Sequence, residues 1–145
     1  MIFFSSALVL RVNNNIIMNN LIVDAASDKF FLTFIVSNNI YTCSHENSKI
    51  NFEKLMILIN DFLKVNSSSF DQIDVIYVNR GPGSFAGIRN SLATIKALFL
   101  TKKINYYCFS FEDFMGFEEV KYEDVPSLCE KFKIKKNLIN PIYLS

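Results

Sequence analysis

A glycine-rich turn between a strand-like run and a long helical run is the feature that most constrains this chain. Ile73 to Val78 is rich in β-branched residues, which is typical of a buried strand. The next residues, 80–84 (RGPGS), predict a sharp turn. Phe85 to Leu100 then repeats apolar residues at helical spacing. The chain therefore contains a strand–turn–helix unit, which is a building block of α/β folds.

The rest of the chain extends this unit in both directions. The other expected elements are strands at residues 21–26, 30–36, 40–43 and 105–109, a helix at 51–65, a short helical run at 125–132 and an extended segment at 137–144. Asn38 and Asn39 favour a hairpin between the second and third of these strands. The order strands, helix, strand, helix, strand predicts an α/β domain with a mixed β-sheet flanked by helices.

The predicted helix at 85–100 has two apolar stripes. The stripe of large residues, which we expect to face the sheet, is Phe85, Ile88, Leu92, Ile95 and Phe99. A second stripe is Ala86, Ala93 and Ala97 with Leu100. Small residues would let another helix approach closely, so this second stripe is a candidate interface. The alternative is that other parts of the same chain cover it.

The N-terminal 17 residues do not follow the regular pattern that begins after Met18. Ile2 to Val12 is mostly apolar, but it lacks the basic start of a signal peptide and is too short to span a bilayer. We expect either that Met18 is the natural start, which would leave residues 1–17 untranslated, or that they form a loosely held, disordered extension.

Charge argues against a nucleic-acid-binding surface of the chain's own. Its 145 residues carry a formal net charge of +1, whereas a nucleic-acid-binding domain usually shows a strong basic excess. The lysines at 131, 133, 135 and 136 are interpreted as a solvated face.

Cysteine and histidine content restricts metal and redox chemistry. Cys43, Cys108 and Cys129 form no CxxC pair, and His45 is the sole histidine. We therefore expect no metal site. We also expect the thiols to be reduced and the protein to be cytoplasmic.

The glycine turn itself is a candidate phosphate site. Gly81, Gly83 and Gly87, with Ser84, precede a helix whose first amides could face an anion. Their spacing matches neither the P-loop nor the dinucleotide-binding fingerprint. A turn capped by Ser84, with no ligand, is the alternative, and the spacing alone does not decide between them.

The same residues resemble the TsaB (YeaZ) family. Its members carry a turn of the GPGSFTGLR type followed by a helix of the LATAKGL type, and here residues 81–89 read GPGSFAGIR and residues 92–98 read LATIKAL. The family's opening strand, of the I-D-T-S type, resembles Val23 to Ala26, and its P-x-Y-L-R ending resembles Pro141 to Leu144. The resemblance is close over residues 19–110.

The resemblance implies an actin/Hsp70-like (ASKHA) architecture, of which this chain would form one lobe. We expect residues 18–110 to be that lobe, residues 1–17 an N-terminal extension, and residues 111–145 a reduced segment in place of a full second lobe. A nucleotide cleft between two full lobes is then not expected from this chain alone.

The resemblance also implies a function as a noncatalytic partner. The chain would form a heterodimer with a TsaD-like enzyme and, with a TsaE-like ATPase, serve formation of N6-threonylcarbamoyladenosine (t6A) beside the anticodon of tRNAs that read A-starting codons. It would have no cofactor of its own, although ATP or ADP could bind at the partner interface. It would meet tRNA only through the complex, would not contact membranes, and could form a homodimer when alone.

Two departures from related sequences support the absence of catalysis. Ala25 and Ala26 stand where the family carries hydroxyl-bearing residues after the aspartate, here Asp24. The sister family TsaD carries two histidines on one helix, but this chain has only His45. We therefore expect no catalytic residue and no metal ligand.

The candidate residues fall into two groups. A phosphate or nucleotide contact would involve Asp24, Gly81, Gly83, Ser84 and Gly87. By resemblance, the partner interface runs through the two helices of the lobe, at Phe52, Met56, Leu63, Ala86, Arg89, Ala93, Ala97 and Leu100.

Two other functions stay open: an ASKHA-fold ATPase or small-metabolite kinase, with Asp24 orienting a metal-bound water, and a degenerate relative that forms homodimers through the same helices.

Overall fold

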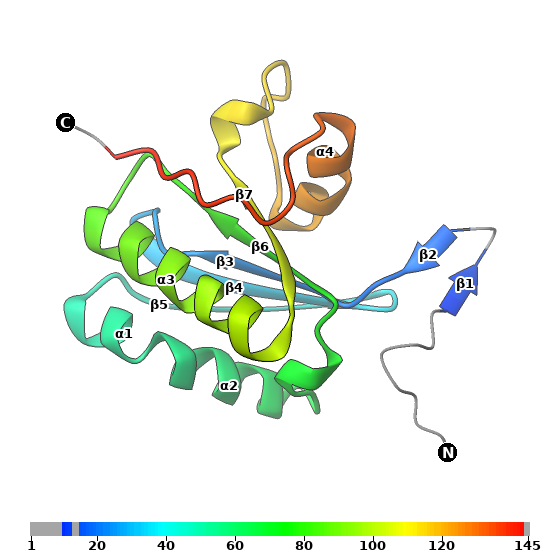
Figure 1. Ribbon diagram of the computed structural model, residues 1–145, viewed down its shortest axis with the longest axis horizontal. Coiled ribbons are helices and arrows are strands. Elements are labelled where there is room, and N and C mark those ends of the chain that lie inside the picture. Colours follow the sequence, from blue (N-terminus) through cyan, green and yellow to red (C-terminus); the bar gives the residue numbers. More distant parts are fainter. Residues whose placement is uncertain (1–9, 13–14, 144–145) are drawn as a thin grey trace.

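A five-stranded mixed sheet forms the centre of the computed structural model, which describes residues 10–12 and 15–143 (Figure 1). Its strands are β3 (Asn20–Asp24), β4 (Lys29–Val36), β5 (Asn39–Glu46), β6 (Val75–Asn79) and β7 (Asn105–Phe109), in the order β5-β4-β3-β6-β7. The pairs β3–β4 and β4–β5 are antiparallel, whereas β3–β6 and β6–β7 are parallel. The predicted mixed sheet is confirmed.

Three helices cover one face of this sheet and one short helix covers the other (Figure 1). The helices are α1 (Lys49–Glu53), α2 (Leu55–Val65), α3 (Phe85–Lys102) and α4 (Val125–Lys131), with short 3-10 turns η1 (Phe70–Gln72), η2 (Phe111–Asp113) and η3 (Tyr122–Asp124). The single helix predicted at 51–65 is divided at Lys54. The Lys54 amide still donates to the Ile50 carbonyl at 3.2 Å, so the helical path is distorted but nearly continuous.

Alternation along the strands separates two hydrophobic cores. On β6, Ile76 and Val78 face the core under α1, α2 and α3, whereas Val75 and Tyr77 face the core under α4. Phe109 of β7 belongs to the second core. The domain is therefore a three-layer arrangement with a buried, two-sided sheet.

The C-terminal segment supplies the third layer of this lobe. Val125 and Leu128 of α4 are buried against the sheet. Further on, the Asn137 amide donates to the Tyr106 carbonyl at 2.8 Å, and the Ile142 amide donates to the Arg80 carbonyl at 2.7 Å. The structure thus describes one lobe, and the residues expected to form a reduced second lobe pack on the first.

The N-terminal segment contributes a small separate hairpin. Strands β1 (Leu10–Val12) and β2 (Asn15–Ile17) pair antiparallel with each other. The remainder of the expected extension, residues 1–9 and 13–14, lies outside the described residues, as does Leu144 of the resemblance. Within the described part of the chain, no helix is both long and apolar enough to cross a membrane.

Candidate functional site

The three glycines of the turn are required by close packing. A methyl group at Gly83 or Gly87 would overlap the carbonyl oxygens of Ala26 and Ala25, respectively. Gly81 has a φ of +106°, which side chains rarely adopt, and a methyl group there would overlap the carbonyl oxygen of another segment. The turn is thus pressed against the loop that leaves β3, which fixes where α3 begins.

Three amides of the turn already have partners within the protein. The Gly81 amide donates to Asn79 Oδ1 at 2.9 Å, and the Ser84 amide donates to the Ala26 carbonyl at 2.9 Å. Ser84 Oγ accepts from the Gly87 amide at 3.2 Å and so caps α3. Three of the candidate phosphate contacts, Gly81, Ser84 and Gly87, therefore use their amides in hydrogen bonds that form the turn. This arrangement agrees with the alternative interpretation, in which the turn is capped by Ser84 and binds no ligand.

Asp24, the fifth candidate phosphate or nucleotide contact, is fully buried at the end of β3. Its Oδ1 accepts from the amides of Ala26 and Ser27 at 3.0 and 3.1 Å. Its Oδ2 accepts from Ser27 Oγ at 2.8 Å and from the Tyr122 hydroxyl at 2.6 Å. Four donors occupy the lone pairs of this carboxylate. In this geometry the carboxylate is a structural acceptor with no lone pair left for a metal-bound water.

Tyr122 is a site residue that the sequence did not identify. Its ring centroid lies 5.6 Å from that of Phe31 and 6.0 Å from that of Phe111. Burial and the neighbouring charge of Asp24 raise the pKa of the Tyr122 hydroxyl, so it remains a donor at neutral pH.

Arg80 closes the same edge of the sheet. Its Nη2 lies 2.7 Å from Asp113 Oδ1, its Nε donates to Asp113 Oδ2 at 3.4 Å, and its Nη1 donates to the Asn140 carbonyl at 3.0 Å. Asp113 Oδ2 also accepts from the Ser110 amide at 2.8 Å. Residues from the C-terminal segment therefore cover the carboxyl ends of β3 and β6, where open α/β sheets commonly bind ligands. Among the described residues, no group of three or more His, Cys, Asp or Glu could hold a metal ion.

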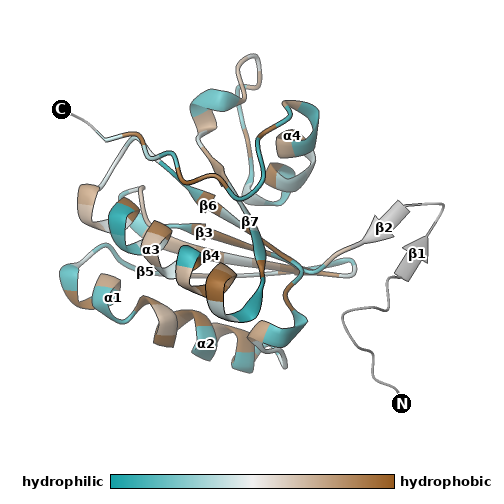
Figure 2. Cartoon of the chain, in the orientation of Figure 1, coloured by the Kyte–Doolittle hydropathy of each residue, from teal (hydrophilic) through white to brown (hydrophobic). Residues whose placement is uncertain are grey.

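Six of the eight predicted interface residues are on the surface. Met56 of α2 is 38% exposed and Leu100 of α3 is 59% exposed. The other four, also exposed, are Ala86, Arg89, Ala93 and Ala97. We call these six residues the docking surface. Figure 2 shows hydrophobic positions on both helices, and the two helices contact each other.

Phe52 and Leu63 were placed wrongly in the interface. They are 5% and 0% exposed, because both pack in the core between the helices and the sheet. Ile57, which was not predicted, is 59% exposed on α2. Phe85 was expected to face the sheet, but it is 56% exposed and its ring lies 4.7 Å from that of Tyr143.

Comparison with known proteins shows which family the chain resembles. The tRNA threonylcarbamoyladenosine biosynthesis protein TsaB of Buchnera aphidicola subsp. Baizongia pistaciae is 34% identical to this chain over 83 residues. Over this stretch the chain is similar to the TsaB (YeaZ) family. The match covers 50% of this chain and 38% of that relative, so the chain spans well under half of the relative's length.

Two further comparisons agree with the TsaB (YeaZ) fold. The family model for TsaD, tRNA N6-adenosine threonylcarbamoyltransferase, matches residues 45–110. Two structures from Pseudomonas aeruginosa, YeaZ and a protein with similarity to the peptidase YeaZ, each superpose with a TM-score of 0.59 at 17% identity. They cover 64% of this chain, and the chain covers 44% and 43% of them. The mixed sheet with its helices is therefore a TsaB/TsaD-type ASKHA lobe.

Proposed function

We propose that this chain is a noncatalytic partner of a TsaD-like protein in the formation of t6A beside the anticodon of tRNAs that read A-starting codons. The observation that carries the proposal is the exposed stripe of small residues on α3. Ala86, Ala93 and Ala97 lie on one side of the helix, opposite the buried Ile88 and Ile95.

The chemistry of the docking surface suits a helix from another protein. Alanines allow two helix axes to approach to about 8 Å, the short end of the usual range. Leu100 of α3 and Met56 of α2 add exposed apolar area, and burying such side chains is favourable by roughly 25 cal/mol per Å². Arg89, within the stripe, could pair with an acidic group on the partner and fix its orientation.

A partner built from the same kind of lobe fits this surface. The TsaD family model matches residues 45–110, which include α2 and α3. A TsaD-like protein would then present corresponding helices, and two related lobes can pack through the same patch about a pseudo-twofold axis. A second copy of this chain could use the surface in the same way, so a homodimer is the competing outcome.

The closed edge of the sheet favours a noncatalytic role over an ATPase or a small-metabolite kinase. Asp24 has its four acceptor positions filled, and the turn amides of Gly81, Ser84 and Gly87 have protein partners. We propose that the chain has no cofactor of its own and that ATP or ADP, if bound, lies at the partner interface. A TsaE-like ATPase and the tRNA would join through the complex, in the cytoplasm.

The test is reconstitution with the TsaD-like protein of the same organism. t6A formation should need this chain in stoichiometric amount. The Ala93→Arg variant should fail to support t6A formation, whereas a folded Asp24→Asn variant should still support it. ATP turnover by the isolated chain that disappears in Asp24→Asn would instead support the kinase or ATPase. A stable homodimer that excludes the TsaD-like protein would support the degenerate relative.

A further inference from the structure

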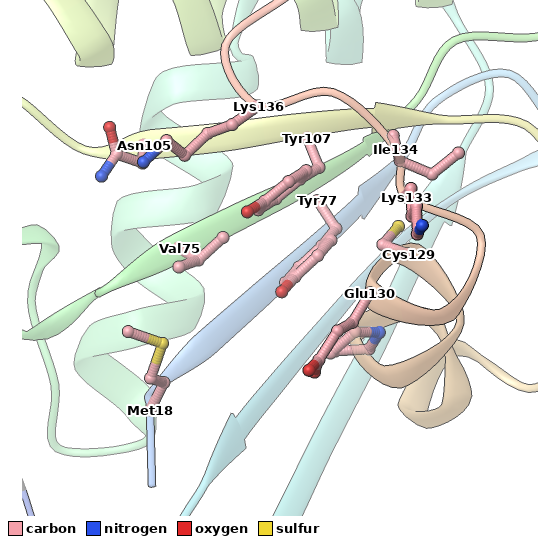
Figure 3. A pocket seen from close by; sticks show the side chains of 11 residues that line it. Met18, Val75, Tyr77, Asn105, Tyr107, Cys129, Glu130, Lys133, Ile134 and Lys136 are labelled. Atoms are coloured by element: carbon pink, nitrogen blue, oxygen red, sulfur yellow. The ribbon is translucent and has the colours of Figure 1, made fainter. Parts of the chain in front are cut away.

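A pocket on the opposite side of the sheet has no role in the docking proposal. It has a volume of about 430 Å³ and lies between β6, β7 and α4 (Figure 3). Its apolar lining includes Val75, Ile134 and Met18. Pockets of this size hold small metabolites, and α1, α2 and α3 lie on the other side of the sheet.

Two tyrosines provide hydrogen-bond donors in this pocket. Tyr77 and Tyr107 are paired across β6 and β7, and their rings stack with centroids 5.3 Å apart and an interplanar angle of 11°. Figure 3 shows both hydroxyl groups on the same side of the stacked pair. Burial raises the pKa of Tyr77, so its hydroxyl keeps its proton at neutral pH. We find no hydrogen bond from either hydroxyl to any described residue.

The charged groups of the pocket favour an anion. Lys133 and Lys136 line it, both are exposed, and neither forms an ion pair with a described residue. Glu130 also lines the pocket and is the one carboxylate in its lining. The lining therefore carries two positive charges against one negative charge, together with two neutral hydroxyl donors.

We propose that this pocket binds a small phosphate monoester whose organic part rests on the apolar lining. A phosphate has three terminal oxygens, which can accept from lysine ammonium groups and tyrosine hydroxyls together, whereas a carboxylate has two. Val75 and Ile134 provide the contact for the organic part, and Glu130 disfavours a second anionic group near it. This site and the docking surface lie on opposite sides of the sheet, so each can fail without the other.

The experiment is a titration of the full chain with AMP, inorganic phosphate and adenosine, followed by amide NMR shifts and calorimetry. AMP should bind saturably, with shifts at β6, β7 and α4, and more tightly than inorganic phosphate. Adenosine lacks the phosphate and so cannot form the charge-assisted hydrogen bonds to the lysines. Since losing one such bond is enough to weaken binding about tenfold, adenosine should bind at least about tenfold more weakly than AMP.

Substitutions separate the pocket from general attraction to lysines. Lys133→Gln with Lys136→Gln should weaken AMP binding about tenfold or more. The matched pair, Lys131→Gln with Lys135→Gln, removes the same charge from exposed lysines outside the pocket and should have little effect. Tyr107→Phe keeps the ring stack and should also weaken binding. Absence of saturable AMP binding, or equal loss in both lysine pairs, would overturn the proposal.

Discussion

The Tyr122 hydroxyl donates a 2.6 Å hydrogen bond to the carboxylate of Asp24, 98 residues earlier in the chain. This contact joins the C-terminal segment to the end of β3, at the edge where an ASKHA lobe would be expected to hold its ligand. Arg80 and Asp113 make a second such link nearby. Together the two contacts hold the lobe closed at this edge.

Tyr122→Phe tests the first link. The ring and its contacts with Phe31 and Phe111 remain, but the buried carboxylate loses one donor. A hydrogen bond to a charged group contributes about 2 kcal/mol, so the free energy of unfolding in urea should fall by that amount. Tyr41→Phe, on an exposed tyrosine of β5, is the control and should change stability little. Equal stability of Tyr122→Phe and the native chain would show that the contact is not formed in solution.

Gly87→Ala tests whether the glycine turn is a packing requirement. The added methyl group would overlap the Ala25 carbonyl oxygen, so α3 would have to shift. We expect the free energy of unfolding to fall by on the order of 3 kcal/mol. Gly116→Ala is the comparison, because nothing lies within 4 Å of the added carbon and only its φ of +95° opposes it, at roughly 1 kcal/mol. Thermal and urea unfolding measure both variants. A Gly87 variant no less stable than the Gly116 variant contradicts the packing explanation.

Arg80→Ala should release the end of the chain. The side chains of Arg80 and Asp113 are 16% and 19% exposed, so losing the pair should cost about 2 kcal/mol, less than for a fully buried pair. Hydrogen exchange at the Ile142 amide should accelerate, because that amide bonds to the backbone of residue 80. Lys102→Ala breaks only an exposed pair with Asp71 and serves as the control. Unchanged exchange at Ile142 in Arg80→Ala would refute this role.

Stability should fall in mild alkali because of two buried thiols. Burial raises the pKa of Cys108 and of Cys129 from 9.0 to about 12. Between these values the unfolded chain loses protons that the folded chain keeps, so the stability present below pH 9 is lost as the pH rises towards 12. Urea midpoints measured from about pH 8 to pH 10 should decline, and the decline should be smaller in Cys129→Ala. The same slope in both proteins would contradict the assignment.

The sequence predicted the central elements because their signals are local. The strand and helix on either side of the glycine turn appear at β6 and α3 within two residues of the predicted limits. The interface prediction was less accurate at Phe52 and Leu63. Apolar residues surround most of the helix at 51–65, so its periodicity did not indicate which of them faces the sheet.

The contact between Tyr122 and Asp24 could not be predicted from local pattern. It depends on the path of residues 111–124, where apolar periodicity is weak, and on a separation of 98 residues. One signal was present: an aspartate that ends a buried strand needs donors, and Ser27 alone supplies only part of them. A further donor was therefore expected, although no nearby residue indicated which one supplies it.

The central claim is that the docking surface on α2 and α3 binds a TsaD-like protein. The most direct measurement is light scattering coupled to size-exclusion chromatography of this chain mixed with the TsaD-like protein of the same organism. The native chain should elute as a 1:1 complex, and Ala93→Arg with Ala97→Arg should abolish it. Glu118→Arg with Glu119→Arg, which adds positive charge at exposed positions outside that surface, should leave the complex intact. No complex with the native chain, or an undiminished complex with the alanine variants, would contradict the account.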